Sequence, residues 1–285
     1  MIFLTGSSGF LGKFILNELT KKKIRIRCLV RTSLNKEIPG VEWLVGDLTD
    51  KNLDPDILKE CSVVIHSAGL IKGTKEDLLK TNFEGTKNII ELSIKANVKK
   101  IIFISSIDAL LFENSYAISK KMAEETLIHA KMDWVIVRPS QLFGLDDNKN
   151  FYFLDKAIKK YFIIPLPFYG AFKWEPVFVE DLAKYIVNLV YDESAKNRVY
   201  NVVGPECLSF RQIVSIIERY NNVDRFKISL TNGFMLFIEK LLMLILGKHK
   251  AEQFLMSFRD KIIPENDKGE KIRLSTKLSD VFHGN

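Results

Sequence analysis

The chain opens with an apolar strand, a glycine-rich turn and an amphipathic helix, in that order. Residues 1–5 predict the strand and residues 13–19 the helix, and Gly6, Gly9 and Gly12 punctuate the turn between them. Such a turn lets backbone N–H groups approach a pyrophosphate, and the helix N-terminus adds partial positive charge. We therefore predict a dinucleotide-binding turn, with a purely structural tight turn as the alternative. Its expected ligand-facing residues are Gly6, Ser8, Gly9, Phe10, Leu11 and Gly12.

Short apolar runs alternate with helix-like segments through the first half of the chain. Further strands are predicted at 24–30, 41–45, 62–66, 101–105 and 134–138, and helices at 53–60, 76–97, 116–131 and 151–161. This alternation is typical of a parallel sheet covered by helices, with right-handed connections. We expect an α/β fold: a doubly wound Rossmann-type parallel sheet with a smaller, mostly helical C-terminal lobe.

The alternation of strand and helix signals is less regular in the second half of the chain. We place the expected domain limits from this change. A Rossmann domain is expected over 1–165 and a substrate lobe over 166–285, with 177–203 returning to the first domain. Ser209 is expected to cap a helix that runs through Tyr220. The last thirty residues are polar and weakly patterned, so their sequence does not predict order for 255–285.

Residues 234–246 form a strongly apolar segment that Glu239 and Lys240 interrupt. The segment is too short and too interrupted to span a bilayer. A buried or half-buried helix is the default expectation. A membrane-surface or partner-binding helix is the alternative.

Tyr116 and Lys120 give a second chemical signal, because side chains four residues apart share one helix face. A free tyrosine has a pKa of about 10, and a nearby ammonium lowers it by stabilising the phenolate. The pair is therefore suited to exchanging a proton with a carbonyl or hydroxyl oxygen. The alternative, an exposed Tyr and Lys without function, is common at this spacing. It is less favoured here because the pair follows a strand that ends in Ser105-Ser106.

The glycine turn and the Tyr-x-x-x-Lys pair together resemble the short-chain dehydrogenase/reductase superfamily. Further motifs resemble its extended branch, the NAD-dependent epimerase/dehydratases. In the family's order they are 46–48 (GDL), 66–69 (HSAG), 81–86 (TNFEGT), 104–106 (ISS), 138–140 (RPS), 177–183 (VFVEDLA) and 200–205 (YNVVGP). The resemblance covers roughly residues 1–205.

The resemblance implies a role for each matching residue. Tyr116 is the implied acid/base, Lys120 binds the nicotinamide ribose, and Ser106 holds the substrate oxygen, with Ser105 as the alternative. The remaining implied cofactor contacts are Asp47 and Leu48 at the adenine, Ser67, Ala68 and Gly69 after the fourth strand, Asn82 beneath them, Ser105, and Pro139 and Ser140 beside the nicotinamide. A homodimer through the helix of Tyr116 is a further implication of the family.

Arg31 bears on the choice of cofactor. It ends the second predicted strand, where NAD-preferring relatives place a carboxylate on the ribose hydroxyls. A cation there suits a 2′-phosphate, and Thr32 and Ser33 add hydroxyl donors. We expect NADP(H) to be preferred over NAD(H), the alternative being an exposed arginine with no ligand.

The chain departs from the sugar-nucleotide epimerases at one point, since Ser106 and Tyr116 are only ten positions apart. The short connection, residues 174–177 and the apolar 234–246 segment more closely resemble a divergent subgroup that includes the NADPH-binding accessory subunit of respiratory complex I. Some members of that subgroup lack the Tyr or the Lys, and this chain keeps both. We predict an oxidoreductase or epimerase/dehydratase-like enzyme, hydride transfer being coupled to Tyr116. The alternative is an NADPH-binding accessory, assembly or redox-sensing protein.

Composition narrows the remaining choices. Three widely spaced cysteines suggest a reducing compartment, and four scattered histidines give no metal site. The net charge of +7 is concentrated in residues 1–40, without the aromatic interleaving of a nucleic-acid module, so no nucleic-acid partner is expected. We expect a cytoplasmic protein, either free or peripheral to the membrane through 234–246. Its expected substrate is a small molecule with a carbonyl or hydroxyl; the aromatic residues after 138 fit either a ring-bearing substrate or ordinary core packing.

Overall fold

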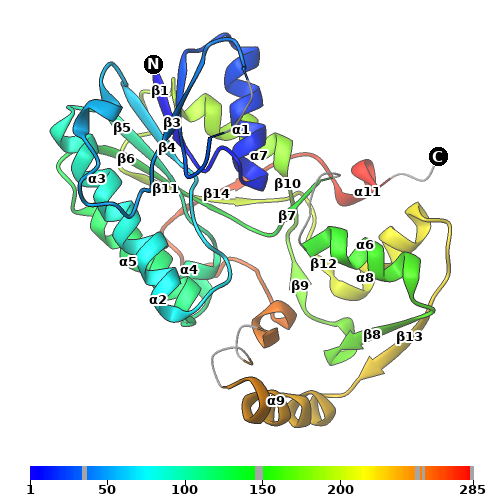
Figure 1. Cartoon of the computed structure of the whole chain (residues 1–285). Helices are drawn as coiled ribbons and strands as arrows, with labels where there is room; N and C mark the ends of the chain where they lie inside the picture. The colour runs from blue at the N-terminus through cyan, green and yellow to red at the C-terminus, as the bar shows by residue number, and fades with distance from the viewer. Residues whose placement is uncertain (34–36, 145–149, 248–250, 252–253, 283–285) are drawn as a thin grey trace. The chain divides into compact units, whose positions relative to one another are not determined.

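Eight strands form the central sheet of the molecule (Figure 1). In spatial order they are β14 (Glu270–Arg273), β11 (Arg198–Val203), β6 (Asp133–Pro139), β5 (Lys100–Ile104), β4 (Val63–His66), β1 (Ile2–Thr5), β2 (Ile26–Val30) and β3 (Val41–Val45). The pairs from β11 to β3 are all parallel. The predicted doubly wound sheet is confirmed, and its order changes direction between β1 and β4, where such sheets bind ligands.

The computed structural model describes residues 1–33, 37–144, 150–247, 251 and 254–282. The chain divides into a first unit of residues 1–139, 179–202 and 265–272, and a second unit of residues 140–178, 203–264 and 273–285. This division differs from the expected limit after residue 165. Residues 140–165 carry short elements of the second unit, whereas 179–202 belong to the first because β11 pairs with β6.

Helices cover both faces of the sheet in the first unit (Figure 1). They are α1 (Phe10–Lys21), the 3₁₀ turn η1 (Pro55–Leu58), α2 (Lys75–Leu78), the π-helical η2 (Leu79–Glu84), α3 (Gly85–Lys95), α4 (Asp108–Leu111), α5 (Ser115–Ile128) and α7 (Val179–Leu189). α1 packs beside α7, and α3 beside α5. The helix predicted over 76–97 is therefore interrupted by a π turn, and the one predicted over 53–60 is a single 3₁₀ turn begun by Asp54 and Pro55.

The second unit is built from short elements around an aromatic core. They are β7 (Leu142–Phe143), α6 (Asn150–Lys160), β8 (Ile163–Pro167), η3 (Phe168–Gly170), β9 (Lys173–Trp174), β10 (Val177–Phe178), β12 (Leu208–Ser209), α8 (Phe210–Tyr220), β13 (Phe226–Leu230), α9 (Asn232–Leu246), η4 (Met256–Phe258) and α11 (Leu278–Val281). Ser209 caps α8 by accepting a hydrogen bond from the Gln212 amide, as predicted. Phe143, Phe151, Phe172 and Trp174 are buried in this core, which favours the packing explanation for these four aromatics.

The C-terminal residues are more ordered than their polar sequence indicated. β14 joins the edge of the main sheet, and Leu278 of α11 is buried in the aromatic core. β14 contains a single apolar residue, Ile272, so no alternating pattern announces it. Pairing to an existing edge, with ion pairs of Glu270 to Arg198 and of Arg273 to Glu175, supplies the order that apolar patterning does not.

α9 is a half-buried helix, which agrees with the default expectation for residues 234–246. Only Met235 is buried among its described side chains, while Phe234, Leu236, Phe237, Leu241, Leu244 and Ile245 are all exposed. Ile238, Glu239, Leu242 and Met243 are half-buried beside Met235, so one face of the helix is partly covered and the other face exposes apolar side chains. Within the described part of the chain, no helix has the length and apolar character needed to cross a membrane.

Candidate functional site

The glycine turn has no room for side chains at its first and last glycines. Gly6 has φ +74°, and a Cβ there would lie 2.6 Å from the Ala68 amide nitrogen. A Cβ on Gly12 would lie 1.9 Å from the Gly6 carbonyl oxygen. The Gly9 amide donates to that same oxygen at 2.9 Å. The turn therefore holds α1 directly against the end of β1.

The N-terminus of α1 keeps its backbone donors available. Gly9 is the N-cap residue and supplies no side-chain hydrogen bond to the first turn. Ser8 and Gly9 are exposed, Phe10 is half-buried and Leu11 is buried. Uncapped N–H groups beside an exposed glycine form the arrangement that binds a phosphate. The residues at this turn thus fit the dinucleotide that the sequence predicted.

Arg31 and Asp47 follow β2 and β3, at the same edge of the sheet. Asp47 accepts a hydrogen bond from the Thr49 amide at 2.8 Å, and this bond lowers the pKa of its carboxyl, with a smaller contribution from the Arg31 guanidinium. Arg31 is exposed. Leu48 is buried against the start of α3, where a Cβ on Gly85 would lie 1.8 Å from its Cδ1. The edge therefore presents one cation and one carboxylate to solvent over an apolar floor.

His66 lies at the centre of a buried hydrogen-bond chain. The Thr86 hydroxyl donates to the Asn82 carbonyl, so it accepts from Nε2–H of His66 at 2.9 Å. Nδ1 of His66 then accepts from the Thr5 hydroxyl at 2.7 Å, and Thr5 Oγ1 accepts from the Ala68 amide. Burial lowers the pKa of His66 to about 3, so the ring is neutral at physiological pH. The chain of bonds fixes its tautomer.

Asn82 extends this chain toward α5 from the π-helical turn η2. Its amide group donates to the Leu70 carbonyl and to the Ser119 hydroxyl, and its carbonyl oxygen accepts from the Leu70 amide. The Ser119 hydroxyl in turn donates to the Tyr116 carbonyl at 2.7 Å. The fully buried Asn82 thereby joins the loop after β4 to the first turn of α5. That loop carries the predicted cofactor residues Ser67, Ala68 and Gly69.

Tyr116 lies near Ser106, which follows β5. Burial raises the pKa of the Tyr116 hydroxyl, the Asp108 carboxylate raises it further, and a hydrogen bond with Ser106 opposes both. Ser106 Oγ also accepts from the Asp108 amide at 3.1 Å, which fixes the serine. Asn114 caps the helix by accepting from the Ala117 amide. The pKa of Tyr116 is thus raised, whereas the spacing to Lys120 had predicted a lowered one, because burial outweighs the nearby ammonium; Tyr116 is a phenol at neutral pH.

Lys120 is buried one turn beyond Tyr116. Its ammonium donates to the Ile104 carbonyl at 2.8 Å and lies 4.7 Å from the ring centroid of Phe103. A Cβ on Gly69 would lie 3.2 Å from its Nζ, so the loop after β4 closes over it. Burial lowers the pKa of Lys120 to about 8, opposed by the carboxylate of Glu124. The amine stays mostly protonated at pH 7.

Two predicted serines have hydroxyls without hydrogen bonds. Ser105 Oγ is buried and lacks a partner in the described structure, while its amide donates to the Val137 carbonyl. Pro139 ends β6 and accepts from the Ile107 amide. Ser140 opens the second unit, where its buried hydroxyl also lacks a partner among the described residues. A buried donor without a partner suits a ligand atom, so Ser105 fits a bound dinucleotide.

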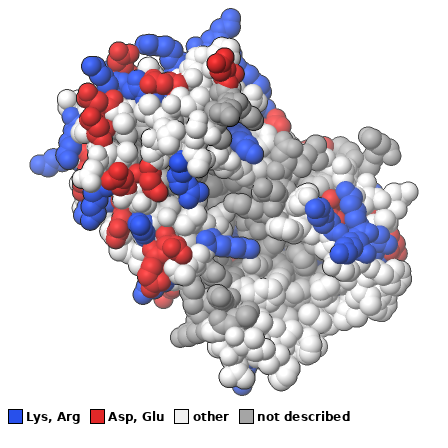
Figure 2. All heavy atoms as spheres, viewed as in Figure 1, with Lys and Arg blue, Asp and Glu red and all other residues white. Residues whose placement is uncertain are grey.

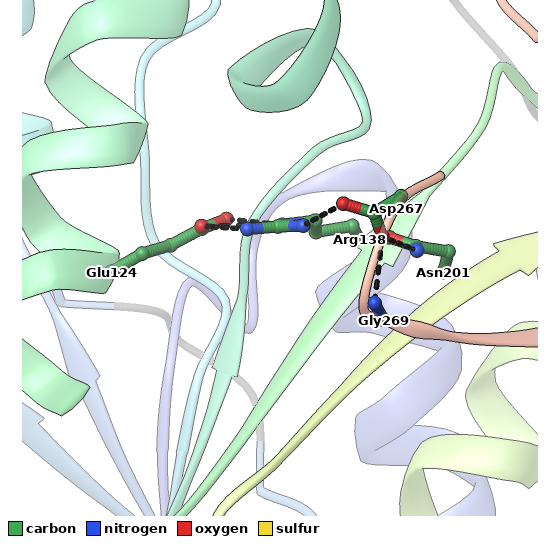
Figure 3. A network of polar contacts seen from close by, with 5 residues as sticks. All are labelled: Glu124, Arg138, Asn201, Asp267 and Gly269. Atoms are coloured by element: carbon green, nitrogen blue, oxygen red, sulfur yellow. Dashed lines mark hydrogen bonds and ion pairs between the residues drawn. The ribbon is translucent and has the colours of Figure 1, made fainter. Parts of the chain in front are cut away.

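None of the five residues of the polar network in Figure 3 was predicted as a site residue. Arg138 binds Glu124 of α5 through Nε and Nη2, the shorter contact being 2.6 Å, and its Nη1 lies 3.6 Å from Asp267. Asp267 also accepts from the Asn201 amide group. Glu124 repeats the four-residue spacing of Tyr116 and Lys120, which is a usable local signal. Nothing local indicates Asp267, because it is remote in sequence.

The match to known proteins covers most of the chain. The model of the NAD dependent epimerase/dehydratase family matches residues 2–203. The chain belongs to that family. It is thus an extended short-chain dehydrogenase/reductase, an enzyme of the NAD-dependent oxidoreductase and epimerase class that acts on a small molecule.

Individual relatives differ in activity. UDP-glucose 4-epimerase of Vibrio cholerae is 32% identical over 247 residues, covering 75% of this chain and 73% of that protein. NADH dehydrogenase (ubiquinone) 1 alpha subcomplex subunit 9 of Mus musculus mitochondria is 27% identical over 212 residues, covering 70% of this chain and 55% of that protein. A crystal structure of UDP-glucose 4-epimerase from Thermotoga maritima, with UDP-glucose, superposes with a TM-score of 0.70 at 19% identity, covering 81% of this chain and 85% of that one. The last likeness concerns the fold.

Proposed function

We propose that this family member uses NADP(H) to interconvert a carbonyl and a hydroxyl on a small substrate, with Tyr116 as the acid/base. The observation that carries the proposal is the set of contacts at the start of α5. Tyr116 is a hydrogen-bonded phenol, Ser106 is fixed beside it, and Lys120 is buried and charged one turn away. Proton donation and a cation on one face of α5 are thereby brought together with oxygen binding by Ser106 after β5.

Reduction of the carbonyl to a hydroxyl takes one proton from the protein and one hydride from the cofactor. A bound reduced nicotinamide would supply the hydride to the carbonyl carbon. Ser106 donates a hydrogen bond to the carbonyl oxygen, and Tyr116 gives that oxygen its proton as the C=O bond becomes C–O–H. The positive charge of Lys120 stabilises the phenolate that remains on Tyr116. In reverse, the phenolate takes the hydroxyl proton, which is also the first step of an epimerisation.

The residues that would hold the dinucleotide are those built above. The turn 6–12 and the start of α1 suit the pyrophosphate, and Asp47, Leu48 and the loop 67–69 suit the adenosine half. Asn82, Ser105, Lys120, Pro139 and Ser140 complete the proposed set. Arg31 favours a 2′-phosphate because its guanidinium is exposed directly after β2 and can pair with an anion.

Tyr116→Phe tests the catalytic proposal. The variant should bind NADPH as the wild type does, measured by nucleotide fluorescence. It should lose about 100-fold or more in turnover on any accepted substrate, from UDP-hexoses to aldehydes and ketones. Tyr191→Phe is the matched control, since that tyrosine is exposed in the same unit. Full turnover by Tyr116→Phe would refute the mechanism, and a wild type that holds NADPH but turns over nothing would favour the accessory role.

Arg31→Ala tests the cofactor preference separately. We expect the NADPH dissociation constant to rise about tenfold and that of NADH to change little, since a single charge-assisted contact is lost. Arg25→Ala removes another exposed cation, just before β2, and is the control. Equal affinities for both nucleotides in the wild type would contradict the preference.

We also propose that α9 holds this protein at an anionic membrane surface, on the cytoplasmic side. The exposed half of the helix carries six apolar side chains and one cation, Lys240. Figure 2 shows the surface over α9 almost without charged groups apart from one basic group. A lysine among apolar side chains extends toward lipid phosphates while its stem stays in apolar surroundings. A second copy fits less well, because a two-fold contact centred on the helix would place two Lys240 side chains together.

Vesicle sedimentation distinguishes a membrane surface from a second copy of the chain as the partner of α9. The full chain should bind phosphatidylglycerol-containing vesicles more tightly than pure phosphatidylcholine, and Leu244→Glu should abolish that binding. Phe153→Glu changes an exposed apolar side chain on α6 and is the control. Absence of vesicle binding by the wild type would refute the proposal, and dimers lost on Leu244→Glu would identify a second copy instead. The homodimer through α5 stays a separate prediction.

A further inference from the structure

Four charges alternate in sign from the proposed active site to the C-terminal part of the chain. Lys120 and Glu124 lie on one face of α5, Arg138 ends β6, and Asp267 comes from the segment before β14. Their side chains are mostly withdrawn from solvent, with 3% of Glu124, 14% of Arg138 and 10% of Asp267 exposed. Charges in such surroundings act on one another more strongly than surface charges do.

Arg138 is shared between two carboxylates. It holds Glu124 through two nitrogens, at 2.9 and 2.6 Å, and it directs a third nitrogen toward Asp267 at 3.6 Å (Figure 3). Burial alone would lower the pKa of Arg138, but the two carboxylates outweigh it and raise the pKa. Because Asp267 also attracts the Arg138 guanidinium, Arg138 neutralises the Glu124 carboxylate less completely. The remaining negative potential of Glu124 stabilises the charged form of Lys120.

Asp267 is held in place independently of Arg138. It accepts hydrogen bonds from the Asn201 amide group on β11 and from the Gly269 amide at 2.8 Å. A Cβ on Gly269 would lie 2.4 Å from Asn201 Nδ2, so the turn closes tightly on β11. The carboxylate therefore has a fixed position, set by the edge of the sheet.

We propose that Asp267 is a positioning residue of the active site, acting through Arg138 and Glu124 on the protonation of Lys120. A residue late in the sequence would thereby influence the protonation of a side chain on α5. The inference rests on the proposed function only for its catalytic consequence, since the state of Lys120 is measured without a substrate. Among the described residues, His66 on β4 is also within electrostatic reach of Lys120, and it carries no charge above pH 5; Tyr116 precedes Lys120 by one turn of α5.

Lysine side-chain NMR on the full chain tests this directly. In protein labelled with ¹³C and ¹⁵N at lysine, Lys120→Arg identifies the Lys120 signal, which titrates near pH 8. Asp267→Asn removes a negative charge and leaves Glu124 more fully neutralised by Arg138. We expect the Lys120 midpoint to fall by about half a pH unit. Glu124→Gln should lower it further.

The control removes the same charge nearby but outside the network. Glu270 lies on β14, half exposed, and pairs only loosely with the exposed Arg198 at 3.4 Å. Glu270→Gln should leave the Lys120 midpoint unchanged. Asp267→Glu, which keeps the charge, should restore the wild-type midpoint and covers the case in which Asp267→Asn folds poorly. Equal midpoints in Asp267→Asn and Glu270→Gln, or no restoration by Asp267→Glu, would overturn the proposal.

Discussion

The two units of this protein bury different kinds of side chain. The first unit buries polar and charged side chains beside its sheet, among them His66, Asn82, Thr86, Ser119 and Lys120. Almost every one of their polar atoms has a hydrogen-bond partner. The second unit buries rings, such as Phe172 stacked on Phe210 with centroids 4.9 Å apart.

The difference shows where geometry is specified most closely. A satisfied polar network allows one arrangement of side chains, because each displaced group loses a partner in a medium of low dielectric constant. Aromatic packing depends on area and volume, and it tolerates changes of shape more readily. The first unit therefore holds α5 in a defined position. The second unit obtains its stability from contact area.

Phe172→Ala should have the largest effect on stability. The ring is buried against Trp174, Phe210 and Phe258, and its removal leaves a cavity. We expect a loss of about 3–5 kcal/mol in the free energy of unfolding, measured by urea denaturation. Phe162→Ala removes a ring that is 70% exposed and should cost far less. A small effect of Phe172→Ala would mean that contact area does not stabilise the second unit.

His66→Gln should have an intermediate effect that depends on pH. The folded ring has a pKa of about 3, whereas the unfolded ring titrates near 6.5. Below pH 6.5 the unfolded chain binds a proton that the folded chain does not, so the wild type loses stability as pH falls. Between pH 6.5 and 4.5 this amounts to about 2–3 kcal/mol.

The measurement is urea unfolding of wild type and variant across that range. The stability gap between wild type and His66→Gln should narrow as pH falls, because the variant lacks the buried imidazole. His129→Gln, at an exposed site, should follow the wild type at every pH. A constant gap between wild type and His66→Gln would show that the buried ring is protonated in the folded state.

Ser119→Ala should have the smallest effect. The hydroxyl accepts from Asn82 and donates to the Tyr116 carbonyl, so the variant leaves both groups with one partner fewer. We expect a loss of about 1 kcal/mol in unfolding free energy. Ser194→Ala, in an exposed turn, is the control. A cost well above 3 kcal/mol would mean that the network acts as a single cooperative unit.

Local patterns predicted most of the fold and the first part of the site. Glycines between a strand and a helix, and Tyr116 four residues before Lys120, are short-range features that the final structure does not rearrange. The family resemblance supplied roles for residues such as Asn82. Those roles stay predictions, although the structure brings Ser106 and Tyr116 together.

What the sequence could not supply depends on distant pairings. Arg138 and Asp267 are brought together by the order of strands in the sheet, and no local spacing encodes that contact. α9 is apolar nearly all round, so periodicity does not indicate which half is covered. β14 is held by its neighbour in the sheet and by ion pairs to residues distant in sequence, rather than by apolar side chains of its own. In each case a partner elsewhere in the chain decides the outcome.

The place of Asp267 near the end of the chain has a consequence for synthesis. At about 5–20 residues per second, a ribosome adds Asp267 roughly ten seconds after Arg138. During that interval a nascent chain already contains α5 and β6, while the second carboxylate for Arg138 has yet to be made. A message cut short late in its reading frame would thus yield a protein with the glycine turn, Tyr116 and Lys120 all present, but with the charges around Lys120 unbalanced.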